Sequence, residues 1–275
     1  MTLSTFRILH TEQRDSVSCN NIQPMVLPLL VLLSAEASAL DPNLPSEHAL
    51  RVSCYCEENV WRLAYRRLNA SLNQAKEKAP TTAEVRKYHV AFISNKDKCC
   101  PLFYQKASKD SSSPCFWDYH VILLETTFSR KTSNNSSKLQ DNDANNNIAE
   151  EATTNVLDLD SRLPYPCPIA LYLNETFHPT LSKTSTDFAP LFRVLPAATF
   201  LEHFYSDRMH MFDRKNQTWS SPPPNYECIL NGRQENEIST SNLGNYINMT
   251  QQPQATIYGR VLTLDEMKTQ AFTEI

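Results

Sequence analysis

Three side-chain types that together can perform nucleophilic catalysis occur in order along this chain of 275 residues. A cysteine, Cys56, lies in the run SCYCEEN at 53–59, a histidine, His120, lies in WDYHV at 117–121, and Asp158 lies in LDLD at 157–160. A thiol becomes a strong nucleophile when an imidazole removes its proton and a carboxylate orients that imidazole. The pattern predicts a thiol hydrolase in which Cys56 is the nucleophile, His120 the base and Asp158 the orienting acid.

Two neighbouring residues are alternatives for these roles. Cys54 precedes Cys56 by two positions, so in an extended segment both side chains would point the same way. A helix that starts at Cys56 favours this thiol, because the N–H groups and dipole of a helix start lower a thiol's pKa and can hold an oxyanion. Asp160 lies on the same face as Asp158 and remains an alternative orienting acid.

Other polar and aromatic residues near the motifs have structural interpretations. His89 lies in a strand pattern and is expected to pack in the core. His203 and His210 flank a helix end and are interpreted as part of a surface polar network. Trp117 and Tyr119 alternate with their neighbours along a strand pattern, which favours sheet packing over contact with a substrate.

Composition excludes several classes of protein. The chain has 26 basic and 30 acidic residues and a formal charge of −4, so neither nucleic acid nor an anionic membrane is implied as a partner. Only three glycines occur, which excludes glycine loops that bind phosphate. The cysteines are irregularly spaced and lack zinc-knuckle spacing, so we expect reduced thiols and no bound metal.

The pattern along the chain predicts one catalytic domain, 49–275, after an extension, 1–48, that is expected to be disordered. Within the extension, 25–39 resembles a secretory signal, although its basic residues lie far from the apolar run, and this interpretation is disfavoured. Strands are predicted at 88–94, 101–104, 116–125, 156–159 and 188–194, and helices at 56–72, at 196–204 and within 262–267, with Thr263 as the N-cap of the last.

The stretch 127–154 is rich in asparagine, serine, aspartate and lysine, and it is expected to be a disordered insertion at a hairpin tip. The cost of closing a loop grows only with the logarithm of its length. The flanking strands can therefore still pair, and this pairing would bring Asp158 close to His120.

The quoted motifs together resemble one family, the protein N-terminal glutamine amidohydrolases, or WDYHV-motif family. The resemblance rests on CYCEENVW at 54–61, WDYHV at 117–121 and DLD at 158–160. Further segments follow in the family's order over about 50–268: AFISN at 91–95, QKA at 105–107, LPYP at 163–166, FRV at 192–194, SDRMHM at 206–211, and Trp219 with the prolines at 222–224.

The resemblance implies an α+β fold similar to papain-like and transglutaminase-like enzymes, with a mainly antiparallel sheet flanked by helices. It implies conversion of a protein's N-terminal glutamine to glutamate with release of ammonia, as in the arginine branch of the N-degron pathway, in cytoplasm and nucleus. Cys56, His120 and Asp158 match the family's catalytic residues, and no cofactor is required. We expect a monomer that acts on protein substrates.

Selectivity for a terminal residue requires a group that holds the free α-ammonium. Glu57, Glu58 and Asp118 are the candidates for this role. Two rival functions use the same features: a cysteine protease or acyltransferase with the same triad, and a binding module for N-termini that has lost catalysis. A secreted, disulfide-bonded protein is a third alternative.

Overall fold

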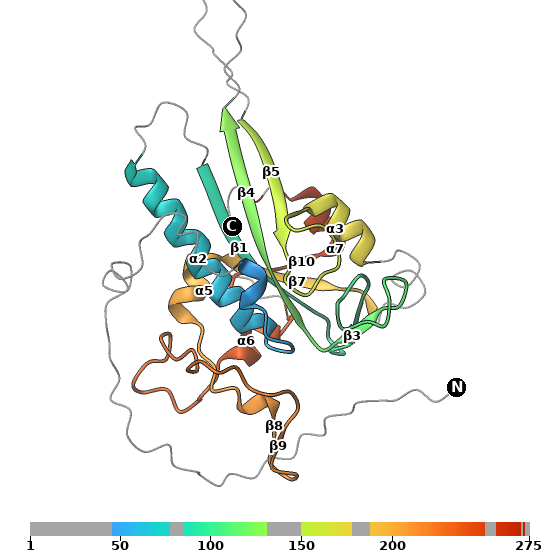
Figure 1. Ribbon diagram of the computed structural model, residues 1–275, viewed down its shortest axis with the longest axis vertical. Helices are drawn as coiled ribbons and strands as arrows, with labels where there is room; N and C mark the ends of the chain where they lie inside the picture. Colours follow the sequence, from blue (N-terminus) through green and yellow to red (C-terminus); the bar gives the residue numbers. More distant parts are fainter. Residues whose placement is uncertain are drawn as a thin grey trace, which may run out of the picture.

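The described part of the chain is built around one antiparallel sheet (Figure 1). The computed structural model describes residues 46–77, 85–130, 150–177, 188–250, 257–270 and 272. The six strands follow the order β10-β7-β1-β4-β5-β6, and each neighbouring pair is antiparallel. Their bounds are β1 Val85–Ser94, β4 His120–Arg130, β5 Glu150–Leu157, β6 Cys167–Pro168, β7 Leu191–Pro196 and β10 Arg260–Thr263.

Both faces of this sheet are covered. Along β1, Val90 and Phe92 belong to one core, whereas Ala91 and Ile93 belong to a second core. Successive side chains of a strand point to opposite faces, so a strand that is buried on both sides is apolar at consecutive positions. This explains why residues 90–93 form an unbroken apolar run.

The first face carries helices α2 (Cys56–Glu77), α5 (Ala197–His203) and α6 (Leu243–Ile247). Val60, Leu63 and Ala64 are buried on α2 at the three- and four-residue spacing of one helix face. Figure 1 shows α2 and α5 together on one side of the sheet. The long α2 therefore packs along the sheet, and its first turn lies near the strand ends. None of the helices in the described ranges is both long and apolar enough to cross a bilayer.

The second face carries α3 (Ile169–Thr176) and α7 (Leu264–Thr269), which lie side by side (Figure 1). The predicted N-cap of α7 is confirmed: Thr263 accepts a hydrogen bond from the backbone N–H of Glu266, whose side chain accepts from the backbone N–H of Thr263. This reciprocal capping box satisfies N–H groups that a helix start leaves unpaired.

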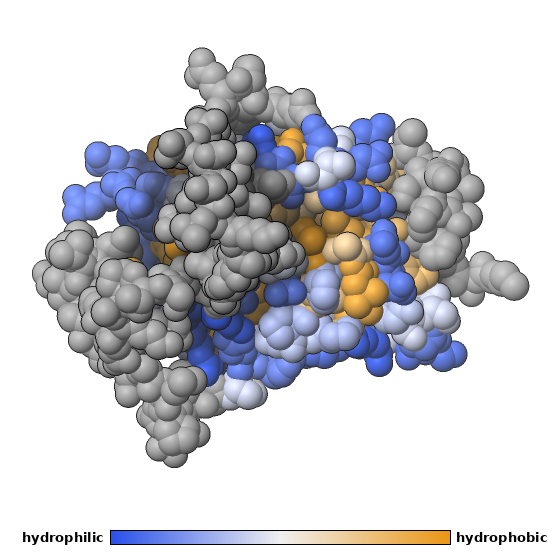
Figure 2. Space-filling view, turned by 90° about the horizontal axis from the view of Figure 1, so that it is seen from above, coloured by the Kyte–Doolittle hydropathy of each residue, from blue (hydrophilic) through white to orange (hydrophobic). Residues whose placement is uncertain are grey.

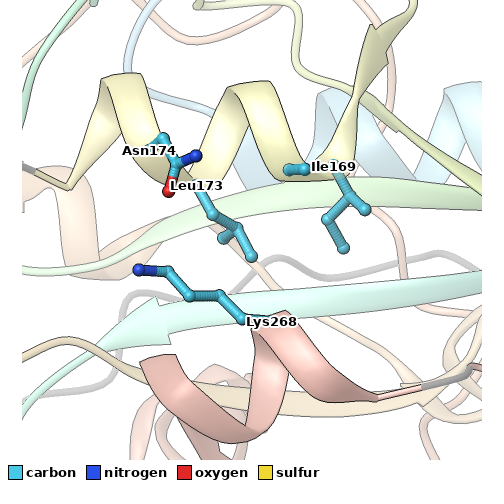
Figure 3. Close-up of a pocket in the computed structure, with 5 residues that line it drawn as sticks. Ile169, Leu173, Asn174 and Lys268 are labelled. Atoms are coloured by element: carbon cyan, nitrogen blue, oxygen red, sulfur yellow. The ribbon is translucent and has the colours of Figure 1, made fainter.

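A hollow of about 250 Å³ lies between α3 and α7 (Figure 3). It is lined by Ile169, Ala170, Leu173, Asn174 and Lys268. Figure 2, seen from above, shows exposed hydrophobic residues between hydrophilic neighbours. The hollow shares no residue with the cysteine, histidine and aspartate motifs.

The predicted strand at 116–125 is wrong as one unit. It is divided into β3 (Cys115–Trp117), which pairs with β2 (Cys100–Leu102), and β4 of the large sheet. At the break, the hydroxyl of Ser94 donates to the carbonyl of Asp118, and the backbone N–H of Tyr119 donates to the side chain of Asp118. These bonds replace ladder bonds, so the chain turns between the two strands.

Other boundaries differ from the sequence expectation in length. The helix predicted at 56–72 continues to Glu77. The strand predicted at 188–194 is β7, which begins later, at Leu191, and ends at Pro196. Strands β4 and β5 extend into both ends of the expected insertion, and 131–149 lies outside the described residues. Residues 1–45, with the signal-like segment, also lie outside them. The remaining short elements are η1 Glu47–Leu50, η3 Met209–Met211, β8 Phe212–Asp213 and β9 Thr218–Trp219.

Candidate active site

The three residues predicted to react lie where helix and strand ends meet. Cys56 is the first residue of α2, His120 is the first residue of β4, and Asp158 directly follows β5. The register Leu123↔Leu157 in the antiparallel β4–β5 pair places the start of β4 beside the end of β5. Cys56, His120 and Asp158 are 7%, 1% and 5% exposed, so any reaction there proceeds largely shielded from water.

Asp158 is the acid beside the histidine. Its Oδ1 lies 3.1 Å from Nε2 of His120 and accepts a 2.8 Å hydrogen bond from the backbone N–H of Asp160. Its Oδ2 accepts a 2.8 Å hydrogen bond from the hydroxyl of Tyr172 on α3. Burial opposes ionisation of Asp158, but His120 and these donors outweigh burial and lower the pKa of the carboxyl. Asp158 is therefore a fixed anion.

The alternative acid, Asp160, has a different partner. Its Oδ1 accepts a 2.6 Å hydrogen bond from Nε of Arg51, just before the cysteine motif. Asp160 thus joins the segment before α2 to the loop after β5. Its backbone N–H supports Asp158, so the two aspartates contribute to the same loop in different ways.

His120 keeps one ring nitrogen available for proton transfer. Nε2 lies 3.1 Å from Oδ1 of Asp158, an ion-pair contact without hydrogen-bond geometry, and Nδ1 has no hydrogen-bond partner among the described residues. Burial is the largest single effect and lowers the pKa of this imidazole, but the charge of Asp158, its contact with the ring and the charge of Asp160 together outweigh burial, and the net shift is upward. The ring of Trp117 stacks on the imidazole at a centroid distance of 5.7 Å, so the predicted packing role of Trp117 includes a direct contact with His120.

The thiol of Cys56 lies against the residue that follows the histidine. The backbone N–H of Val121 favours the ionised form of this thiol, and Sγ of Cys56 lies 3.7 Å from Oε2 of Glu57. No hydrogen bond joins the thiol to the ring of His120 in this structure. Burial, followed by the negative charges of Glu57 and Asp160, raises the pKa of the thiol well above its ordinary value. The resting sulfur is therefore protonated and needs a base.

Cys54 differs from Cys56 in backbone and surroundings. It has a positive φ of 67°, is only partly buried, and its Sγ lies 3.7 Å from the hydroxyl of Ser53. The side chain of Asn59 holds the preceding loop with two 2.8 Å hydrogen bonds to the backbone of Val52. These two hydrogen bonds fix the loop before α2, so that the helix starts at Cys56 and not at Cys54. The cysteines of the described ranges are all free of disulfides, and Cys19 lies outside those ranges.

Glu58 and Asp118, two of the three candidates for substrate binding, have different environments. Both oxygens of the buried Glu58 accept hydrogen bonds from Arg208, at 2.7 and 2.8 Å, so this carboxylate is engaged within the protein. Asp118 is exposed, and its charge acts on the thiol of Cys56 and on the ring of His210. Asp118 is therefore the candidate that a substrate in solution can reach directly.

Glu57 lies buried beside the sulfur. Its Oε2 accepts a 2.9 Å hydrogen bond from the hydroxyl of Tyr119, and its Oε1 lies 3.6 Å from Nε2 of His210. Burial raises the pKa of this carboxyl to about 7, against hydrogen bonds from its own backbone N–H, from Tyr119 and from the thiol. A group with that pKa changes its charge near neutral pH.

Sequence reasoning missed several of these partners. His210 lies at the surface, as expected, but its ring faces the buried Glu57, a partner that the sequence did not indicate. Segment η3 lies over the first turn of α2 because Arg208, just before η3, pairs with Glu58. Tyr172 and Asn59 carried no signal in a single sequence, because a hydroxyl or an amide gains its partner only in the fold.

A metal site needs several His, Cys, Asp or Glu side chains that lie together. Across the described ranges, no group of three or more metal-binding side chains comes together.

Comparison with known proteins agrees with the motifs. The sequence profile described as N-terminal glutamine amidase matches residues 51–271. A Bos taurus protein named "Protein N-terminal glutamine amidohydrolase" is 31% identical over 221 residues, which are 79% of this chain and 86% of the relative. Proteins of the same name from Drosophila willistoni and Oryza sativa subsp. indica are 34% and 35% identical, over 72% and 71% of this chain and 78% and 71% of their own lengths. The chain belongs to the N-terminal glutamine amidase family.

Proposed function

We propose that this protein hydrolyses the side-chain amide of an N-terminal glutamine in other proteins, which yields N-terminal glutamate and ammonia. The observation that carries the proposal is the grouping of Cys56 at the start of α2 with the His120–Asp158 pair at the strand ends. Membership of the family and the names of the relatives support the same reaction.

The first half of the proposed mechanism forms a thioester. Nδ1 of His120 takes the proton of the thiol as Sγ of Cys56 attacks the carboxamide carbon, and Asp158, 3.1 Å from Nε2, orients the ring. The carbonyl oxygen becomes an oxyanion. Backbone N–H groups in the first turn of α2 stabilise it, because the first N–H groups of a helix have no backbone carbonyl partner within the helix.

The second half releases both products. The imidazolium of His120 protonates the carboxamide nitrogen, the C–N bond breaks, and ammonia leaves. His120 then removes a proton from water, whose oxygen attacks the thioester carbon. Collapse of this intermediate expels the sulfur, which regains its proton from His120, and the terminal residue leaves as glutamate. No metal or organic cofactor takes part in this scheme.

Selectivity for a terminal residue requires recognition of the free α-ammonium. Among the predicted candidates we assign this role to Asp118. It is exposed, and its negative charge contributes to the raised pKa of the Cys56 thiol. Glu58 is no longer proposed, because Arg208 occupies both of its oxygens.

The finer features carried by the family resemblance are proposals too. The fold would be of the papain-like or transglutaminase-like kind, in which a nucleophile opens a helix and a histidine and an acid come from strands. The protein would act as a monomer in cytoplasm and nucleus and supply glutamate ends for arginylation in the N-degron pathway. Residues 1–48 would form an extension outside the single catalytic domain.

Mass spectrometry of a glutamine-initiated peptide tests the proposal. We expect the mass gain of replacing –NH₂ by –OH, with release of ammonia, for the free N-terminus and no change for the N-acetylated peptide. Cys56→Ala should reduce the rate by more than about 10⁴-fold, because removal of a nucleophile removes the covalent route. Cys54→Ser is the matched control and should retain activity. Cleavage of a backbone bond, or full activity of Cys56→Ala, would contradict the proposal.

A further inference from the structure

A second polar group contacts the nucleophile, and the mechanism above does not use it. Glu57 is 0% exposed and its Oε2 lies 3.7 Å from Sγ of Cys56. The hydroxyl of Tyr119 donates to the same oxygen at 2.9 Å and fixes its position. The first turn of α2 therefore presents a sulfur and a carboxyl group to the same small space.

The other oxygen of Glu57 lacks a donor. Oε1 is buried and accepts no hydrogen bond from the described residues, and Nε2 of His210 lies beyond hydrogen-bond range at 3.6 Å. A buried acceptor without a donor is costly, and such groups in native proteins require an explanation. A substrate that brings N–H donors next to the sulfur would satisfy this oxygen.

We propose that Glu57 recognises the carboxamide nitrogen of the terminal glutamine and thereby distinguishes substrate from product. This inference rests on the proposed function. During attack the carboxamide carbon lies about 3–3.5 Å from the sulfur, and its nitrogen is one bond away from that carbon. Oε2 of Glu57 lies 3.7 Å from the same sulfur, and the unpartnered Oε1 belongs to the same carboxyl group, so a nitrogen placed on that side of Sγ can donate to Oε1.

The chemistry of the two ligands explains why a carboxylate suits this position. A glutamine side chain offers two N–H donors, and an ionised carboxylate only accepts. The glutamate product offers no donor and carries a negative charge, which Glu57 repels. The same contact would hold the substrate and promote departure of the product.

The groups around Glu57 favour this assignment. Glu58 on α2 is neutralised by Arg208, and the thiol, Tyr119 and His210 complete the surroundings of the carboxyl. Burial lowers the pKa of His210, so its ring is neutral over most of the neutral range. The pKa of Glu57, about 7, means that the charge beside the sulfur changes near neutral pH.

Binding of the α-ammonium by Glu57 fits the geometry less well. In an extended glutamine the α-nitrogen lies about 5 Å from the carboxamide carbon, because three carbons separate them. Glu57 is buried next to the sulfur, whereas Asp118 is exposed. Glu57 thus suits the carboxamide of the terminal residue, and Asp118 suits its α-ammonium.

Equilibrium binding to an inactive variant tests the inference. On the Cys56→Ala background, calorimetry compares two peptides that differ only in a terminal Gln or Glu. We expect Glu57→Gln to reduce the preference for the Gln peptide by at least about tenfold, because the new amide can donate to the product carboxylate. Asp118→Asn is the matched control and should weaken both peptides equally, since they share the α-ammonium.

A second measurement avoids any effect of Glu57→Gln on folding. With Cys56→Ala alone, the Gln-over-Glu preference should rise between about pH 6 and about pH 8, as Glu57 ionises and the product carboxylate stays charged. The α-amino group titrates in both peptides, so it cancels from the ratio.

Two results would overturn the inference: equal weakening of both peptides by Glu57→Gln, or a preference that is independent of pH. If the wild-type protein still deamidates the Gln peptide, these results leave the proposed function intact. Failure of the wild-type protein to deamidate it would instead reject the function itself.

Discussion

Two buried carboxyl groups lie in the active site, and their pKa values are shifted in opposite directions. Asp158, at the strand ends, lies beside the imidazole of His120 and accepts hydrogen bonds from a backbone N–H and a tyrosine hydroxyl, and its pKa is lowered. Glu57, on the first turn of α2, has an oxygen that no donor among the described residues reaches, and its pKa is raised to about 7. Burial is similar for both, so the neighbouring charges decide: His120 lowers the pKa of Asp158, whereas Glu58 raises that of Glu57.

A third acid, Glu58, completes this comparison. It is as buried as Glu57, and it lies next to Glu57 in the chain, yet a two-pronged contact with Arg208 satisfies both of its oxygens. Adjacent residues of one helix thus serve different ends: Glu58 holds the segment around Arg208 onto α2, and Glu57 remains available beside the sulfur. Each of the following experiments alters one of these three carboxyl groups or a residue that contacts it.

Removal of the fixed anion should have the largest effect. Asp158→Asn should lower kcat/KM by about 10³-fold or more, because the imidazolium of His120 loses its stabilising charge and orientation. Steady-state kinetics with a glutamine peptide measures this loss. Asp160→Asn is the matched control, and an equal loss there would show that the loop, and not the charge beside His120, matters.

Breaking the satisfied pair should mainly reduce stability. Arg208→Met leaves Glu58 buried without a partner, and we expect unfolding to require about 3–5 kcal/mol less free energy. Denaturant titration measures this change. The double variant with Glu58→Met should recover part of the loss, because neither charge remains. Purely additive losses would contradict the idea that the two side chains act as a pair.

Glu57→Gln should change how stability depends on pH. The folded-state pKa of about 7 exceeds the ordinary value of 4.5, so between these values the folded protein binds more protons than the unfolded chain. Stability of the wild-type protein therefore falls as pH rises through this window, by up to about 3 kcal/mol, and the variant lacks this fall. Thermal melts across the window compare them. Parallel curves would show that Glu57 does not titrate there.

The smallest change removes one donor from Asp158. Tyr172→Phe deletes the hydroxyl that donates to Oδ2, so the pKa of Asp158 should rise and kcat should fall by about tenfold. The acidic limb of the pH–rate profile should shift upward, which loss of packing alone would not cause. A fall in kcat with an unchanged acidic limb would assign Tyr172 to packing.

Several features were correctly predicted from local patterns. The start of α2 at Cys56 and the cap at Thr263 follow from periodicity and capping chemistry, which depend on residues close together in sequence. The pairing of the strands that flank the insertion follows from the low cost of closing a longer loop. The break between β3 and β4 was missed because hydrogen bonds from Ser94 and from the backbone of Tyr119 to Asp118 replace ladder bonds there, and no periodicity signals this.

The sequence by itself determined which reactive groups this protein has, the order in which they occur and the family to which they belong. Only the tertiary structure decided that Asp158 faces His120 while Asp160 faces Arg51, and that Arg208 binds both oxygens of Glu58 while Oε1 of Glu57 has no donor among the described residues. The physical reason is that a buried carboxyl group's charge depends on the charges and donors that the fold brings next to it. The partner of Glu58 lies 150 residues away in the chain, at a distance where spacing carries no information.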